Sequence, residues 1–243
     1  MKVCAFVILL SFFSLSTFSK TITLSRGEDA VLQKFSELIL QKAYQKIGIE
    51  LKIIHVPIAR SLVLANNGIV DGDVSRISKI ENQYGNLIKI PVPINHIDIR
   101  MFSYNKKLLA NKNNINGFYR MGCVRGLILV EKISTTMKAD CYKVNGHKQG
   151  INMLNKNRID VLLLPLTIGA YFKSVDSQFS TSHYSDSLGR EPLFHYLHKK
   201  HHKLVPKLTL ILQQMNIDIY EKTYRDSLKE TISPDGNSSV LIN

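Results

Sequence analysis

The sequence has few cysteines and, after its first residues, no long hydrophobic run. Only three cysteines occur in 243 residues. No segment after residue 19 approaches the ~20 apolar residues that a membrane helix needs. The sequence also lacks a Gly-x-Ser-x-Gly elbow, a phosphate-binding loop and a zinc-type His/Glu pair. These absences argue against a second membrane anchor and against the enzyme classes that those motifs mark.

Residues 1–19 have the order of a secretory signal peptide. Lys2 gives a positive start, residues 3–15 form an unbroken run of apolar and small side chains, and small residues follow. This run is too short to span a bilayer. We therefore predict cleavage after Ser19 and a protein free in the periplasm. A buried N-terminal strand or an uncleaved anchor is the alternative.

Acidic residues are scarce relative to basic ones. Nineteen Asp and Glu face 32 Lys and Arg, which gives a formal charge of +13. We expect no nucleic-acid partner, because the chain carries an export signal and its lysines are scattered rather than alternating with exposed aromatics. The excess charge is interpreted as a field that favours anionic ligands or anionic membrane surfaces. A solubilising surface with no partner is the alternative.

Two cysteines remain after the predicted cleavage, Cys123 and Cys141. In an exported protein they can form one disulfide that closes a loop of modest length. The sequence does not show whether their β-carbons approach closely enough. Without a base partner nearby, the pair gives no indication of a thiol enzyme.

Strand-like and helical segments alternate in two successive blocks. Strands are predicted at residues 21–25, 51–56, 69–74, 87–92, 97–101, 118–123, 141–144, 160–166 and 192–198. Helices are predicted at 32–43, 57–65, after Gly126, at 151–155, 204–215 and 219–228, with loops at 105–116 and 174–187. This alternation predicts an α/β fold with a mainly parallel sheet. The division into two blocks favours two lobes over one continuous sheet.

Several phrases resemble, in the correct order, the type II periplasmic binding proteins, specifically the family-three extracellular solute-binding group and its transporter substrate-binding domain proteins. They run through most of residues 21–216. The phrases are "ELILQKAYQKIGIEL", "PIARSLVLANNGIVDGDVSRI", "YGNLIKIPVPI", "GCVRG", "INMLNKNRIDVLLLP" and "PLFHYLHKKHHKLVPKLTLILQQM".

The resemblance implies a two-lobed α/β fold joined by two inter-lobe crossovers. Lobe 1 would comprise residues 20–95 plus 194–243, and lobe 2 residues 96–193. A small ligand would bind in the cleft between them, which closes by hinge bending. The expected protein is a monomer without cofactor that delivers a solute to an ABC-type transporter or a sensor.

The phrase "VDGDVSR" contains the first candidate ligand residues. By resemblance, Arg76 corresponds to the arginine that holds the ligand's carboxylate, and Asp73 could receive an ammonium or hydroxyl group. Turn chemistry with Gly72 is the alternative for the aspartates, and the favoured one for Asp71. Arg60, in the first turn of a short helix, could bind a carboxylate or phosphate. Otherwise its stem covers apolar surface.

The phrase "GCVRG" supplies the candidates from the second lobe. Arg125 and Gly126 resemble a loop at a helix N-terminus whose backbone N–H groups meet an anion, although a hydroxyl residue is common there in the family. Arg26 could complete a basic cleft. Pro165 stands where amino-acid binders carry the carboxylate that captures the ligand's ammonium, and a proline offers no anion. We therefore predict an anionic or neutral polar solute.

Four histidines, His195, His198, His201 and His202, suggest a metal site at first sight. No nearby cysteine completes a first shell of metal ligands with them, and exposed histidines at the start of a helix are the alternative, so we predict no metal site. Two other functions stay open: a dehydratase-like enzyme on the same fold, and a degenerate domain that serves only as a docking surface.

Overall fold

The computed structural model describes residues 20–27, 31–78, 80–110 and 119–215. Its strands are β1 (Lys20–Gly27), β2 (Ile49–Val56), β3 (Gly72–Ile77), β4 (Leu87–Ser103), β5 (Met121–Val124), β6 (Cys141–Val144), β7 (Val161–Pro165), β8 (His183–Tyr184) and β9 (Gly189–His198). Its helices are α1 (Val31–Lys46), α2 (Ile58–Asn66), α3 (Lys107–Ala110), α4 (Ile128–Thr136), α5 (His147–Asn155), α6 (Leu166–Val175), α7 (Ser177–Ser180) and α8 (Val205–Gln214), with short 3₁₀ helices η1 (Ile80–Asn82) and η2 (Lys199–Leu204).

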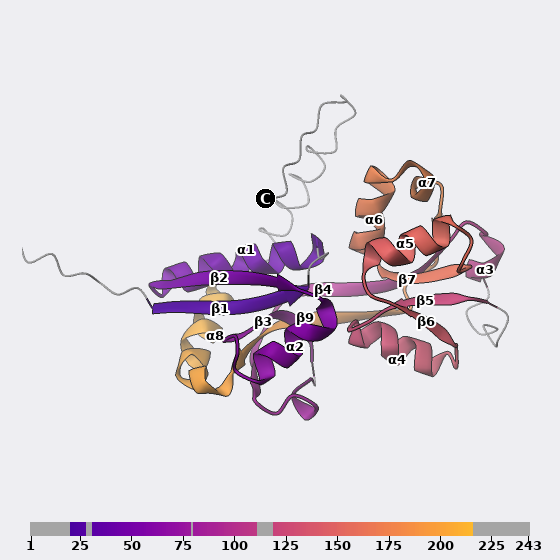
Figure 1. The fold of residues 1–243 in the computed structure, drawn as a ribbon. Coiled ribbons are helices and arrows are strands. Elements are labelled where there is room, and N and C mark those ends of the chain that lie inside the picture. Colours follow the sequence, from indigo (N-terminus) through magenta and orange to yellow (C-terminus); the bar gives the residue numbers. More distant parts are fainter. Residues whose placement is uncertain (1–19, 28–30, 79, 111–118, 216–243) are drawn as a thin grey trace, which may run out of the picture.

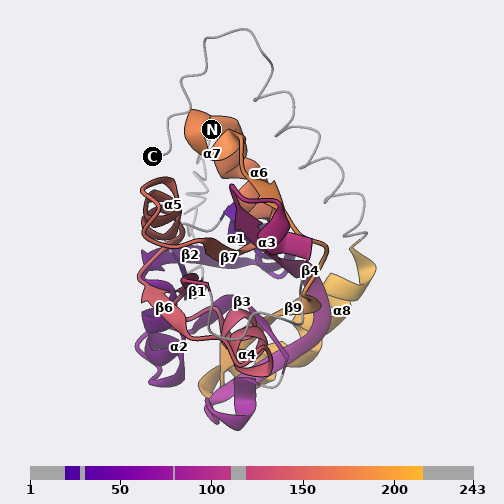
Figure 2. The same ribbon diagram turned by 90° about the vertical axis from the view of Figure 1, so that its right-hand side faces the viewer.

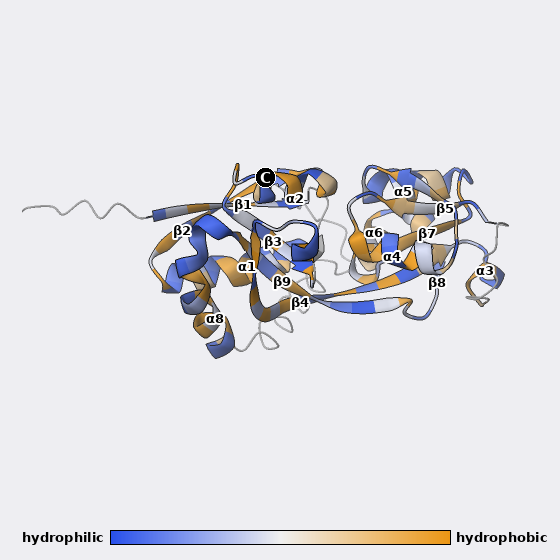
Figure 3. Ribbon diagram, turned by 90° about the horizontal axis from the view of Figure 1, so that it is seen from below, coloured by the Kyte–Doolittle hydropathy of each residue, from blue (hydrophilic) through white to orange (hydrophobic). Residues whose placement is uncertain are grey.

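The elements gather into two groups that we call the lobes. Lobe 1 contains β1, β2, β3, α1, α2 and α8, and lobe 2 contains β5, β6, β7 and α4 to α7 (Figure 1). In lobe 2, helices α5, α6 and α7 lie on one side of the strands and α4 on the other (Figure 2). Strands β4 and β9 run between the lobes and join them (Figure 3). The predicted division at residues 95 and 193 stays a prediction.

The strands are paired in the order β2-β1-β3-β9-β4-β7-β5-β6, with β8 on β4. Pairing is parallel within each lobe, for example β1 with β2 and β5 with β7. It is antiparallel wherever β4 or β9 takes part. Hydrogen bonding therefore runs unbroken across both lobes, because the crossover strands pair with neighbours on either side. The expected α/β class is confirmed, while the sheet is mixed rather than mainly parallel.

Strand β4 is a single 17-residue strand where the sequence predicted two separate ones. Its register against β9 shifts between Lys89 and Pro93 and again between Pro93 and Asn95. Proline cannot donate a ladder hydrogen bond, so a strand containing Pro91 and Pro93 accommodates them at such irregularities. The irregular stretch lies where the chain passes from one lobe toward the other.

Four further differences separate the predictions from the structure. Helix α6 was not predicted, and α7 and β8 lie inside a segment expected to be a loop. Residues 107–110 form α3, again in an expected loop. Ile69, expected in a strand, precedes β3 in a bend and is 68 % exposed. The predicted helix at 219–228 and the predicted signal peptide lie outside the described residues.

The core consists of apolar side chains from the sheet and its covering helices. One buried cluster lies within lobe 1 and combines α1 and α8 with β1 and β4. A second cluster combines Leu62 of α2 and Ile77 of β3 with Leu129 and Val130 of α4. This second cluster crosses from one lobe to the other, so the structure shows the lobes in contact. Within the described ranges, no helix has the length and apolar character needed to cross a bilayer.

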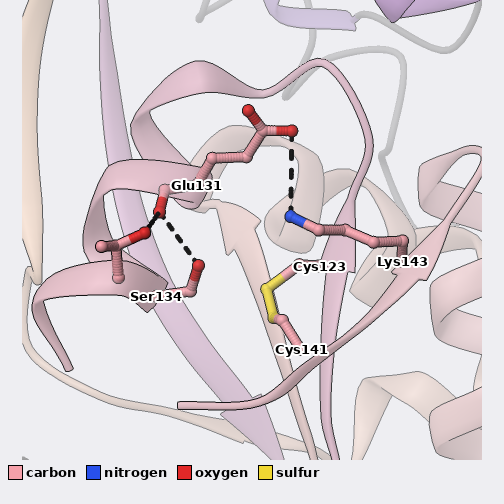
Figure 4. The surroundings of a disulfide bond; sticks show 6 residues. Cys123, Glu131, Ser134, Cys141 and Lys143 are labelled. Atoms are coloured by element: carbon pink, nitrogen blue, oxygen red, sulfur yellow. Dashed lines mark hydrogen bonds and ion pairs between the residues drawn. A yellow bond between two sulfur atoms is a disulfide. The ribbon is translucent and has the colours of Figure 1, made fainter. Parts of the chain in front are cut away.

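The structure joins Cys123 of β5 to Cys141 of β6 in a disulfide, with the two Cα atoms 5.7 Å apart (Figure 4). The strands are parallel neighbours in which Met121 pairs with Cys141, so the two cysteines sit two residues apart in register. Lys143 of β6 also reaches Glu131 of α4, at 3.9 Å. The bridge closes an 18-residue separation around α4, which ties this helix to the edge of lobe 2.

Candidate ligand cleft

A cavity of about 50 Å³ lies between the lobes. Its walls come from α1, α2 and β3 on one side, from α4, α5 and the β7–α6 junction on the other, and from both crossover strands. The lining residues are Gln33, Ile58, Ser75, Arg76, Ile77, Ile97, Gly126, Leu127, Ile128, Leu129, His147, Pro165, Ile168 and Leu193. A small solute held here would touch both lobes at once.

Arg76 is the charged side chain in this wall. It is only 6 % exposed, and its Nη2 donates to Asp73 Oδ2 at 2.9 Å and to the Ile58 carbonyl at 3.3 Å. Its Nε has no hydrogen-bond partner among the described residues. The guanidinium is thus fixed on one edge while a buried N–H donor stays available, which is how an arginine is prepared for an anionic ligand.

Asp73 holds Arg76 in place from behind the cavity. Its side chain is fully buried and does not line the cavity. Besides Arg76, it accepts from Ser61 Oγ at 2.6 Å and from the Ser75 backbone N–H at 3.2 Å. A buried carboxylate with three donors is satisfied, so its role is to orient the guanidinium.

Ser75 and Gln33 add a second polar feature beside the arginine. Gln33 of α1 accepts from the Gly27 N–H at 2.8 Å and donates to the Ser75 carbonyl at 3.2 Å, which fixes the end of β1 against β3. The Ser75 side chain is buried, and its Oγ has no partner within the part of the chain that the structure describes. A buried hydroxyl without a partner costs free energy that a bound ligand recovers.

Lobe 2 approaches the cavity through Gly126 and the start of α4. Gly126 has φ +80°, and a Cβ built on it would lie 2.6 Å from the backbone nitrogen of Ala59 in α2. Only glycine combines a left-handed backbone with such a close approach. Leu127, the N-cap of α4, makes no side-chain cap bond. The first N–H groups of α4 therefore stand beside the cavity, where a helix favours negative charge.

The structure places the other predicted site residues away from the cavity. Arg26 is buried in an ion pair, with its Nε 3.0 Å from Glu37 Oε2 of α1. Arg60 and Arg125 are exposed, and none of these three lines the cavity. The buried face of α2 is formed by Ile58, Ser61, Leu62 and Ala65, and its helical periodicity turns Arg60 outward.

Several lining residues had not been singled out from the sequence. Gln33 belongs to the buried face of α1, and His147, 2 % exposed, begins α5. Their polar character on otherwise apolar faces was the available signal. Pro165, which the sequence did single out, ends β7, is the N-cap of α6 and lines the cavity. No acidic side chain lines the cavity within the described ranges.

His195 of β9 is hydrogen-bonded to the backbone of Asp73, the residue that orients Arg76. It is fully buried in β9, with Nε2 2.9 Å from the Tyr44 hydroxyl and Nδ1 2.9 Å from the Asp73 carbonyl. Because a carbonyl can only accept, Nδ1 donates and Nε2 accepts from Tyr44. Burial lowers the pKa of His195 to about 4 and raises the pKa of Tyr44. Both groups are therefore neutral at physiological pH.

The other three histidines of the 195–202 segment, His198, His201 and His202, lie at the end of lobe 1 that contains η2. His201 Nε2 and Lys200 Nζ both reach Asp71 Oδ1, at 2.6 and 2.8 Å. Partial burial would raise the pKa of Asp71, but hydrogen bonds from Lys200, the Thr23 backbone and His201 outweigh it and lower the pKa to about 2. Asp71 thus ties β1 to η2. Among the described residues, no group of three or more His, Cys, Asp or Glu side chains forms a possible metal site.

Comparison with solved structures identifies the fold. No protein-family model matches the sequence, and no curated protein matches it. An amino-acid ABC transporter substrate-binding protein, AbpA from Streptococcus pneumoniae, bound to L-arginine, superposes with a TM-score of 0.71 at 15 % identity, over 87 % of this chain and 96 % of the other. A putative L-cystine ABC transporter protein from Listeria monocytogenes gives 0.70 at 15 % identity, over 86 % and 95 %.

A histidine kinase sensor domain with similarity to periplasmic binding proteins gives a TM-score of 0.69 at 10 % identity, over 86 % and 96 % of the two chains. These matches extend over nearly the whole of each solved structure. The chain has the fold of the type II periplasmic binding proteins, in the form shared by amino-acid transport receptors and sensor domains. The expected resemblance is confirmed at the level of fold.

Proposed function

We propose that this protein is an exported solute receptor that closes its lobes around a small carboxylate-bearing molecule. One observation carries the proposal. Arg76 is buried in a cavity shared by both lobes, and its Nε lacks a partner among the described residues. A guanidinium edge in a mainly apolar cavity binds a carboxylate or another planar anion well. The Ser75 hydroxyl beside it supplies a further polar contact.

The contact between the lobes supports a closing mechanism. Gly126 packs against the first turn of α2, and the buried cluster around Leu129 joins α4 to α2 and β3. A ligand that contacts both walls stabilises this closed arrangement through its differential affinity for the closed state. The proteins of similar fold named above are transport receptors and a sensor domain, which supports delivery of the solute to a transporter or sensor rather than a chemical reaction.

Isothermal titration calorimetry tests the proposal with a panel of small carboxylates, amino acids included. Arg76→Gln should weaken binding of any carboxylate ligand at least tenfold, since a charge-assisted hydrogen bond to a buried group is lost. Arg60→Gln is the matched control, because Arg60 is exposed and lies outside the cavity wall. Equal binding by Arg76→Gln and wild type would remove the assignment.

Native mass spectrometry of the purified protein offers an independent measurement. A co-purified small anion, lost from the Arg76→Gln variant and retained by Arg60→Gln, is the expected result. Turnover of the bound molecule during incubation would instead favour an enzyme. Absence of any thermal shift across the whole panel would favour a docking domain that has no ligand.

A further inference from the structure

We infer that the ligand is a short aliphatic carboxylate without an ammonium group, such as butanoate or 2-oxobutanoate. This inference rests on the proposed function and narrows it to one ligand class. Three properties of the cavity carry it: the apolar character of its walls, the kind of polar group that they present, and its volume. Each excludes part of the range of carboxylates that Arg76 alone would accept.

The walls are mainly apolar. Nine of the fourteen lining residues are aliphatic or proline, and they come from both lobes and from both crossover strands. Ile58, Ile77 and Leu193 are among those that are buried. A ligand enclosed here replaces water against these side chains, so an alkyl portion is stabilised by burial. A polyhydroxylated or dicarboxylate ligand would instead leave its own polar groups without partners.

The polar groups of the cavity suit an anion and not a cation. An ammonium group has three donors and no acceptor, so it needs carboxylate or carbonyl oxygens around it. No Asp or Glu of the described residues lines the cavity. Asp73, the nearest carboxylate to Arg76, is fully buried behind it and already accepts three hydrogen bonds. The oxygen of Gln33 is a neutral acceptor and already accepts one hydrogen bond from the Gly27 N–H.

The charges around the cavity also favour an anionic ligand over one that carries an ammonium group. Arg76 lies in the wall, and the N-terminal N–H groups of α4 stand at the opposite side. An ammonium ion enclosed between them would lose its hydration without gaining an opposite charge, which is strongly unfavourable in a buried site. Pro165, at the β7–α6 junction of the wall, provides neither an anion nor an N–H group.

The volume limits the length of the ligand. A cavity of about 50 Å³ is several times the ~10–15 Å³ that one enclosed water molecule needs, and it is well below the ~300–1,000 Å³ of pockets for drug-sized ligands. The lobes in this arrangement therefore enclose a molecule of few heavy atoms. A longer chain would hold Gly126 away from Ala59 and lose the contact that closes the lobes. We expect the affinity to be greatest for acids of about three to five carbons and to fall for longer ones, since burial cannot compensate for incomplete closure.

The experiment compares three acids that differ at one carbon: butanoate, 2-oxobutanoate and L-2-aminobutanoate. Each is titrated calorimetrically into the full chain and into two variants. Wild type should bind the first two at least tenfold more tightly than the amino acid. Pro165→Asp places a carboxylate in the cavity wall at the N-cap of α6, a position that aspartate favours. It should raise the affinity for L-2-aminobutanoate at least tenfold and lower that for 2-oxobutanoate.

Pro57→Asp is the matched control. Pro57 is likewise an N-cap proline, that of α2, without a side-chain cap bond; it is exposed and does not line the cavity. This variant should keep the wild-type preference. If wild type binds L-2-aminobutanoate as tightly as 2-oxobutanoate, the inferred ligand class is wrong. The proposed receptor function would still stand in that case, provided that Arg76→Gln weakens the binding of both acids. If only longer carboxylates bind, the size limit is wrong. If no carboxylate binds, the proposed function itself fails.

Discussion

The contact between Gly126 and α2 makes closure of the lobes sensitive to a single methyl group. In Gly126→Ala, the added Cβ would lie 2.6 Å from Ala59 N, 2.8 Å from Ala59 Cα and 2.9 Å from the Ile58 carbonyl carbon. All three are backbone atoms of a helix start, so no side chain can turn aside. The lobes must separate, and the closed state is destabilised relative to the open state.

Two free-energy costs act in this variant, and they differ in the states that they affect. The positive φ of Gly126 costs an alanine roughly 1–2 kcal/mol in open and closed states alike, which lowers stability but not affinity. The steric contact exists only in the closed state. An extra methyl group in a tight contact costs about 1–3 kcal/mol, which corresponds to an affinity about 5- to 150-fold weaker.

Small-angle X-ray scattering and calorimetry measure the two consequences. Scattering curves are compared with and without a saturating carboxylate, beginning with 2-oxobutanoate. Wild type should become more compact on binding, and Gly126→Ala should change less. Gly48→Ala separates the two costs, because Gly48 has φ +70° but no atom within 4 Å of its built Cβ. Gly85→Ala, with no positive φ and equally open space, controls for the methyl group alone.

The reasoning would be refuted by a Gly126→Ala protein that closes and binds as wild type does. It would be refuted equally by a Gly48→Ala protein that loses as much affinity, since a backbone effect alone would then explain the result. Loss of stability shared by both variants, with loss of affinity in Gly126→Ala only, is the expected outcome.

Three further predictions concern stability. Acidification from pH 6.5 to 4 should lower the free energy of unfolding, because the unfolded chain protonates His195 while the buried ring, with its pKa lowered to about 4, stays neutral. At about 1.36 kcal/mol per pH unit, the loss of stability amounts to roughly 3 kcal/mol. This loss levels off below pH 4, where the buried ring also takes up a proton. Reduction of the Cys123–Cys141 bridge should cost about 3 kcal/mol, as expected for a loop of this length. Gly169→Ala should lower the melting temperature, since its Cβ would enter the ring of the buried Phe102, at a cost of about 1–3 kcal/mol.

Circular dichroism measures all three effects, in urea denaturation for the first two and in thermal unfolding for Gly169→Ala. His195→Gln should show a flatter pH dependence than wild type between pH 6.5 and 4, and an unchanged slope would contradict the assignment to His195. A double Cys→Ala variant should be insensitive to dithiothreitol. For Gly169, the exposed Gly85→Ala variant is the control, and equal melting temperatures of the two would contradict the packing argument.

Local patterns in the sequence were sufficient for much of the fold. The helix over α1, the proline start of α2, the strand β2 and the amphipathic α8 follow from periodicity and from end signals that act within a few residues. The segment after β7 was not recognised as a helix. Its apolar residues belong to α6, and a short buried strand and a buried helix cannot be separated by periodicity alone.

The cavity includes some of the candidate site residues and not others, for the same reason. Arg76 and Gly126, identified by resemblance to a family, both line the cavity, whereas Arg26, Arg60 and Arg125 do not. A sequence shows that an arginine is present but not which partner it meets. Arg26 finds Glu37 on the neighbouring α1, and this pairing depends on how α1 packs across the end of β1.

The sequence by itself determined the alternation of strands and helices, because this alternation depends on neighbours within one or two turns. The tertiary structure alone decided which polar groups enter the cavity. Asp73, Ser75 and Arg76 lie within four residues of β3, yet Asp73 turns to Ser61 of α2, while Ser75 and Arg76 line the cavity. Their roles depend on helices and a second lobe that are distant in the sequence, and contacts of that range leave no local pattern.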